Sequence, residues 1–272
     1  MTAGSIQCNG VEHVEKLFTT NTTDRDAGIA RMRSGSNAGL VFDRYLDVWK
    51  GFSVVDGKDR YESLARFAAD FNARTKVKNA HVHKLLEIVH ERQSRAVKTR
   101  NGASFSVKLA SRFATGLGGF HPTEVGFTFE RITGVPYLPG SSVKGLARAA
   151  ATFDDEPLRE ELLGPDRIDK ESDAKTGDLV FLDAYPNEWP QLAVDIINCH
   201  HQNYYADKGA PLESDDPIPV YFLTVAPGTT WTFRILSRSR QHAERGAQWL
   251  KDGLKLWGAG AKTAVGYGMF AD

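Results

Sequence analysis

Residues 104–270 alternate between short strand-like segments and two helical ones, and this order restricts the fold more than any other property of the chain. Apolar stretches with strand character lie at 104–119, 125–140, 178–186, 191–198, 219–225 and 229–238, and helical patterns lie at 141–153 and 241–257. The order predicts an α+β fold whose core is ferredoxin-like, or RRM-like, with helices on one face of an antiparallel sheet.

The first hundred residues differ from this core because helical patterns dominate them. An amphipathic segment lies at 11–18, residues 61–97 carry apolar side chains near helical spacing, and the strongest apolar cluster lies between them at 38–52. We therefore predict a mostly helical region, 1–100, packed on a core at 101–272. A polar stretch rich in Pro and Asp interrupts the core at 200–218, and we expect it to protrude as a thumb-like loop or hairpin.

Charge and cysteine content exclude several classes of protein. The 272 residues include 34 basic and 34 acidic side chains, so the net charge is zero. Bulk charge therefore does not drive nucleic-acid binding, although a local basic strip is compatible with it. The cysteines, Cys8 and Cys199, are too few and too far apart for a disulfide framework, which indicates a reducing compartment, the cytoplasm. No apolar run approaches the roughly 20 residues of a membrane span and no secretory leader is recognisable, so we expect no membrane partner.

The predicted helix at 141–153 carries cations near its start, where acidic residues are usual. It begins within LPGSSVKGLARAA, with Ser141 as the candidate N-cap, and Lys144 and Arg148 follow on one face. A helix N-terminus attracts anions, and two like charges four residues apart repel by about 0.2–0.5 kcal/mol unless an anion lies between them. Gly145 would let a ligand backbone come close. A phosphate site and an ordinary solvated basic face are both open interpretations.

The C-terminal stretch WGAGAKTAVGYGMF holds four glycines around a lysine and a threonine: Gly258, Gly260, Lys262, Thr263, Gly266 and Gly268. Such a loop can turn several N–H groups towards a phosphate, with the lysine adding charge. It is not a Walker A loop, because Ala261 stands where that pattern requires glycine and a helix precedes the loop instead of following it. We therefore reject ATP binding. A hairpin that only turns the chain is the alternative.

His121 lies in FATGLGGFHPTE, which lacks the spacing of a dinucleotide-binding loop. It could contact RNA, act as an acid–base group or be a hydrogen-bonded loop residue. His200 and His201 are the other candidate bases. Asp183 and Asp207 could be imagined as cleaving aspartates, but we prefer a structural hydrogen bond for Asp183.

Metal and cofactor chemistry is not expected. His81, His83 and His90 share a predicted helix without a nearby cysteine, and helix-surface histidines are the better interpretation. Paired aromatics at 204–205 could stack on bases, although neighbours in a strand face opposite ways.

These motifs, in this order, resemble the RAMP superfamily of CRISPR proteins. VPYLPGSSVKGLARAA is similar to the family's P-x-x-P-G-S-S-x-K-G element, ELLG…GDLVFLDAYP to its Phe-Gly … Phe-x-Asp-Ala stretch with Leu163 in place of Phe, and GAGAKTAVGYGMF to its terminal glycine-rich loop. NAGLVFDRYL at 37–46 and DIINCHHQNYY at 195–205 further resemble segments of the sixth-numbered subunit family of Cmr (type III-B) complexes.

The resemblance implies a non-catalytic subunit that holds guide RNA (crRNA) near its 3′ end and contributes to target RNA binding, beside other Cmr-type RAMP subunits and a small helical subunit. It gives Ser141, Ser142, Lys144 and Arg148 contacts to guide phosphates and lays the 258–268 loop against the same backbone. Base pairing, not the protein, then reads sequence. The alternative within the superfamily is a metal-free endoribonuclease that processes the guide precursor.

Overall fold

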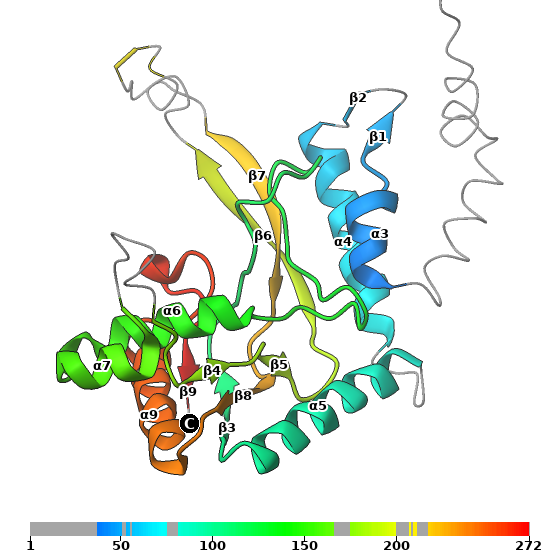
Figure 1. The fold of residues 1–272 in the computed structure, drawn as a ribbon. Helices are drawn as coiled ribbons and strands as arrows, with labels where there is room; N and C mark the ends of the chain where they lie inside the picture. The colour runs from blue at the N-terminus through cyan, green and yellow to red at the C-terminus, as the bar shows by residue number, and fades with distance from the viewer. Residues whose placement is uncertain are drawn as a thin grey trace, which may run out of the picture.

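The computed structural model describes residues 37–50, 53–54, 56–74, 81–165, 175–199, 207, 209–210 and 217–271. Its centre is an antiparallel sheet (Figure 1). The long strand β8 (Thr230–Leu236) pairs with β3 (Ala103–Leu109) on one side. The short strands β4 (Val180–Phe181) and β5 (Tyr185–Pro186) pair with β8 on its other side, and β9 (Phe270–Ala271) pairs with β3. The mixed α and β content agrees with the predicted fold class.

Helices cover both faces of this sheet, one of them from the predicted core and the other from the predicted helical region at 1–100. Alternate side chains of β8 point to opposite faces. Trp231, Phe233 and Ile235 share the face covered by α9 (Arg240–Leu256), where Lys251 lies 5.1 Å from the ring of Phe105. The opposite face of β8 is polar and lies against α5 (His81–Thr99).

A buried arginine explains why α5 packs on a polar strand face. Arg234 is 6% exposed, and its guanidinium donates to Gln93 Oε1 at 2.8 Å and to His90 Nδ1 at 3.0 Å, both on α5. Burial lowers the pKa of Arg234 and is also the main cause of the lowered pKa of His90. A buried charge is tolerated only when its donors are hydrogen bonded, so these bonds hold α5 on the sheet.

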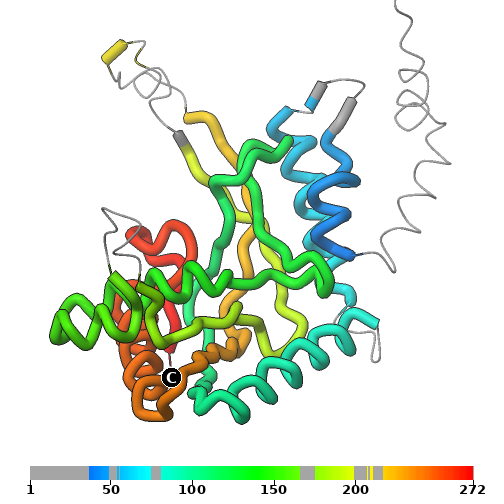
Figure 2. The backbone as a smooth tube through the Cα atoms, viewed as in Figure 1, coloured from blue at the N-terminus to red at the C-terminus, as the bar shows by residue number. Residues whose placement is uncertain are grey.

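A long hairpin, β6 (Leu192–Cys199) and β7 (Ile218–Val225), extends away from the central sheet (Figures 1 and 2). Its base is joined to the core by the bridge between Phe113 and Val225. Only one helix, among the residues described, packs along both arms: α4 (Gly57–Ala73). The predicted thumb at 200–218 lies almost entirely outside the described residues, but the paired arms lead directly to it.

The N-terminal helices are held by an aromatic cluster. Phe42, on α3 (Ala38–Tyr45), packs against Phe67 of α4 and against Phe129 of the core, with ring centroids 5.6 Å apart in both pairs. Between these helices lie the short strands β1 (Trp49–Lys50) and β2 (Ser53–Val54). The segment at 11–18 falls outside the described residues, as does everything before residue 37.

Three predicted strands differ in the structure, and the one predicted at 104–119 ends as β3 at Leu109. Residues 125–140 form no strand, and only the isolated bridges of Phe129 with Pro136 and Leu138 with Ala184 occur there. Residues 178–186 split into β4 and β5, because the chain leaves the sheet at Asp183. No helix among the described residues combines the length and apolarity needed to cross a membrane.

Candidate nucleic-acid interface

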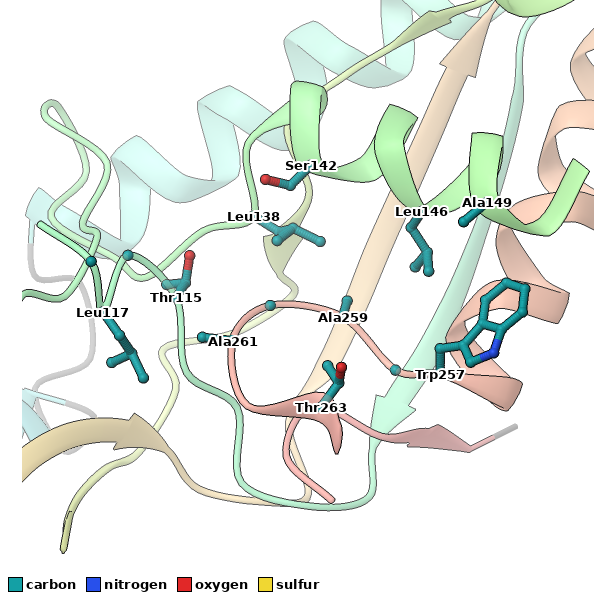
Figure 3. A pocket seen from close by; sticks show the side chains of 14 residues that line it. Thr115, Leu117, Leu138, Ser142, Leu146, Ala149, Trp257, Ala259, Ala261 and Thr263 are labelled. Atoms are coloured by element: carbon teal, nitrogen blue, oxygen red, sulfur yellow. The ribbon is translucent and has the colours of Figure 1, made fainter. Parts of the chain in front are cut away.

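Three segments that are distant in sequence meet around one groove of about 520 Å³ (Figure 3). They are the loop at 115–118, the outer face of α6 (Gly140–Ala150) and the loop that follows α9. The lining residues are Thr115, Gly116, Leu117, Gly118, Leu138, Ser142, Leu146, Ala149, Trp257, Gly258, Ala259, Gly260, Ala261 and Thr263. Because most of these residues are small, an extended ligand chain can approach the protein backbone closely.

The N-terminus of α6 is capped from another part of the chain. The helix begins at Gly140 with Pro139 as N-cap, so the predicted N-cap, Ser141, lies instead within the first turn. Asp183 Oδ1 accepts the N–H of Gly140 at 2.6 Å, which confirms the structural hydrogen bond preferred for this aspartate. A carboxylate here complements the positive end of the helix dipole, so the absence of acidic residues from the first turn needs no phosphate to explain it.

Lys144 and Arg148 lie on one face of α6, as predicted, but not on the face that lines the groove. Lys144 is about 200° around the helix axis from Ser142 at 3.6 residues per turn. Burial lowers the pKa of the Lys144 ammonium, and the charge of Arg148 lowers it further. Arg148 Nη2 donates to the carbonyl oxygen of Leu163 at 2.8 Å, at the end of α7 (Glu156–Leu163). Arg148 therefore has a structural partner that the sequence did not reveal.

The glycines of the C-terminal loop serve mainly the packing of the loop itself. Gly260 has φ 88°, and a Cβ there would overlap the carbonyl oxygen of Ala114. The Ala261 N–H donates to that same oxygen at 2.8 Å, so the C-terminal loop is fixed against the segment that directly precedes the 115–118 loop. Gly266, by contrast, has open space around it. Close packing thus makes Gly260 necessary whether or not a ligand binds.

Three consecutive N–H groups have no acceptor among the described residues, those of Lys262, Thr263 and Ala264, and Thr263 lines the groove. They lie at the start of the 3-10 turn η4 (Thr263–Val265). Consecutive N–H groups of this kind form a concavity that attracts anions. The ammonium of Lys262 lies 5.8 Å from the ring centroids of Phe222 and Tyr267, so it is directed towards β7 and does not line the groove.

His121 lies outside the lining of the groove and is fixed by its own neighbours. Its Nδ1 accepts the N–H of Thr123 at 3.2 Å, and its Nε2 donates to the carbonyl oxygen of Phe42 at 3.0 Å. The imidazole also stacks on the Phe42 ring at 4.1 Å, and burial lowers its pKa. With both ring nitrogens hydrogen bonded within the protein, His121 fits the hydrogen-bonded loop residue better than an RNA contact or an acid–base group.

The helical histidines have structural roles as well. His83 Nε2 lies 3.1 Å from the carbonyl oxygen of Arg74, and His90 Nε2 lies 2.9 Å from that of Pro186. Both side chains are half-buried, whereas His81 is exposed, as expected of a helix-surface histidine. No group of three His, Cys, Asp or Glu side chains suited to a metal ion occurs in the part of the chain that the structure describes. His200 and His201 lie outside that part.

The sequence indicated two of the three walls of the groove as phosphate sites and missed the third. The sequence suggested only a dinucleotide loop for Thr115–Gly118, although this segment is rich in glycine like the 258–268 loop that forms another wall. Trp257 and the Leu146 and Ala149 positions were also missed. The spacing of Ser142, Leu146 and Ala149 at four and three residues is the one signal that could have found this face.

A family model for the RAMP superfamily matches residues 106–271, which is 166 of the 272 residues, and the chain belongs to this superfamily. Among curated proteins, it is 29% identical over 225 residues to the CRISPR system Cmr subunit Cmr6 of Pyrococcus furiosus, a match covering 61% of this chain and 66% of that protein. It is also 29% identical over 154 residues to Cmr6 of Saccharolobus solfataricus, covering 53% of this chain and 48% of that protein. The chain thus spans about half to two thirds of these relatives, and its resemblance to Cmr6 is confirmed.

A solved structure of a type III-B Cmr-beta complex bound to cognate target RNA contains a chain of similar fold. The TM-score is 0.57 at 18% identity, and the match covers 96% of both chains. At this identity the likeness shows the fold alone.

Proposed function

We propose that this chain is a non-catalytic subunit of a type III-B CRISPR effector complex, which holds guide RNA near its 3′ end and contributes to binding of target RNA. The observation that carries the proposal is the groove in which α6 and two glycine-rich loops meet, lined by Thr263, whose N–H group and those of its two neighbours have no acceptor among the described residues. The similarity to Cmr6 supports the same assignment.

The groove suits an RNA backbone better than a small ligand. It is an open channel lined by small side chains and backbone, which favours an extended polymer over an enclosed molecule. Unpaired N–H groups are donors for phosphate oxygens. The proposed contacts are Ser142 and the 258–268 loop in the groove, and Ser141, Lys144 and Arg148 on the rest of the α6 surface. We propose other Cmr-type RAMP subunits and a small helical subunit as its protein partners, and the cytoplasm as the location of the complex.

The test is to express the chain with its genomic neighbours, purify it by a tag and sequence the RNA that co-purifies. We expect short RNAs with repeat-derived 5′ ends and discrete 3′ ends, together with several RAMP-like proteins. Purification of the chain without RNA or partners would overturn the proposal.

A matched pair of variants connects this result to the groove. Thr263→Asp places a carboxylate beside the unpaired N–H groups, and we expect it to reduce guide retention, since like charges repel. Thr263→Val keeps the shape of the side chain and removes only its hydroxyl, so it should retain the guide. Equal guide retention by both variants would show that the guide does not contact this loop.

The alternative, a guide-processing endoribonuclease, receives no support from the described residues, since His121 is occupied on both nitrogens. It stays testable through His200 and His201. Cleavage of repeat RNA by the chain alone without metal, lost on substitution of these histidines by alanine, would replace the proposal above.

A further inference from the structure

Two aromatic side chains lie exposed at one end of the groove. Trp257 follows α9, lines the groove beside Ala149 and is 38% exposed (Figure 3). Phe153 ends the 3-10 turn η2 (Ala151–Phe153) that continues α6, and it is 83% exposed. The two ring centroids are 6.4 Å apart and the ring planes differ by 21°, so the rings present their faces in nearly the same orientation.

The chain segment beside Phe153 is tied to α9 by hydrogen bonds. The carboxylate of Asp154, next to Phe153, accepts hydrogen bonds from Arg245 and, at 2.8 Å, from Trp249 Nε1, and both donors belong to α9. These bonds tie the end of η2 to α9, the helix that Trp257 follows. Phe153 leaves most of its ring in water, where the ring gains little from the hydrophobic effect, and exposed aromatic rings at the end of a groove are typical of a recognition surface.

The position of the pair and its lack of charge favour a nucleobase as the partner. Bases are planar and neutral, and they stack on aromatic side chains with little regard to sequence. The groove that leads to Trp257 is lined by small residues and is the proposed path of RNA. The nearby carboxylate of Asp154 is neutralised by Arg245, so it does not repel an approaching nucleotide.

We infer that Phe153 and Trp257 form a stacking platform for one nucleobase of the RNA in the groove, an inference that rests on the proposed function. The ribose-phosphate backbone then follows the 258–263 loop, while the base turns towards the end of α6. The protein thereby unstacks one nucleotide and holds it without reading its identity.

Photocrosslinking in the purified complex tests this inference. The complex is isolated through a tag on the full chain, irradiated with ultraviolet light and digested, and nucleotide adducts are mapped by mass spectrometry. We expect an adduct on the peptide that contains Phe153 or Trp257. Phe153→Tyr keeps an aromatic ring and should keep the adduct yield, whereas Phe153→Leu keeps apolar surface without a ring and should lower it to background.

The outcomes separate this inference from the function on which it rests. Guide RNA that co-purifies but gives adducts only elsewhere in the groove overturns the platform and leaves the function standing. Absence of guide RNA overturns the function itself. If Phe153→Ala strips a protein subunit from the complex while the adducts are unchanged, the patch is a protein interface and the inference is wrong.

Discussion

Replacing Asp183 by alanine removes the cap of α6, the helix that forms one wall of the groove. The side chain accepts the N–H of Gly140 at 2.6 Å, and its charge faces the positive end of the helix dipole. Loss of a capping side chain costs about 0.5–2 kcal/mol, and loss of a favourable charge at a helix end costs about 0.3–1 kcal/mol. The free energy of unfolding should therefore fall by about 1–3 kcal/mol in Asp183→Ala.

Thermal unfolding followed by circular dichroism measures this loss. In a chain of this size each kcal/mol shifts the Tm by about 2–4 °C, so we expect a decrease of about 2–12 °C. Asp183→Asn keeps an oxygen acceptor without the charge and should lose only the electrostatic part. Asp155→Ala is the matched control, because Asp155 is the N-cap of α7 but its side chain makes no capping bond. Equal Tm values for Asp183→Ala and Asp155→Ala would refute the reasoning.

Three further predictions follow from the same structure. Arg148→Ala should lower the free energy of unfolding by about 1.5–3 kcal/mol in urea titrations, since its charged hydrogen bond to the end of α7 is lost. Lys144→Ala, by contrast, should weaken guide retention with little effect on stability. Gly145→Ala should stabilise α6 by about 0.5–1 kcal/mol because its Cβ enters open space, and Gly145→Asp, equally free of clashes, should weaken guide retention; retention equal to that of Gly145→Ala would count against RNA on this face. Burial lowers the pKa of His90 and His121 below the ordinary value of 6.5, so their contribution to stability is fully present above pH 6.5 and is lost as the pH falls below it. Urea unfolding at pH 7.5 and 5.5 checks this, and a constant free energy of unfolding would contradict it.

Elements with a strong local pattern were predictable from the sequence. The helix at 241–257 differs by one residue at each end from α9, and the strand at 229–238 contains β8, because alternating or helical apolar spacing determines which face each residue presents. The 125–140 segment has similar apolar content but forms no strand. Its polar groups are satisfied locally instead, for example by Glu130, whose carboxylate accepts the N–H groups of Ile132 and Thr133.

Sequence alone determined the superfamily and two of the segments that form the groove, since glycine-rich loops and the start of a helix are local features that need no long-range contact to be recognised. Only the tertiary structure decided which surfaces meet. The Asp183 cap spans 43 residues and the contact of Arg234 with α5 spans more than 140, and such contacts depend on how the sheet brings distant segments together. For the same reason, Phe153 and Trp257 became neighbours only when α6 and α9 packed against each other.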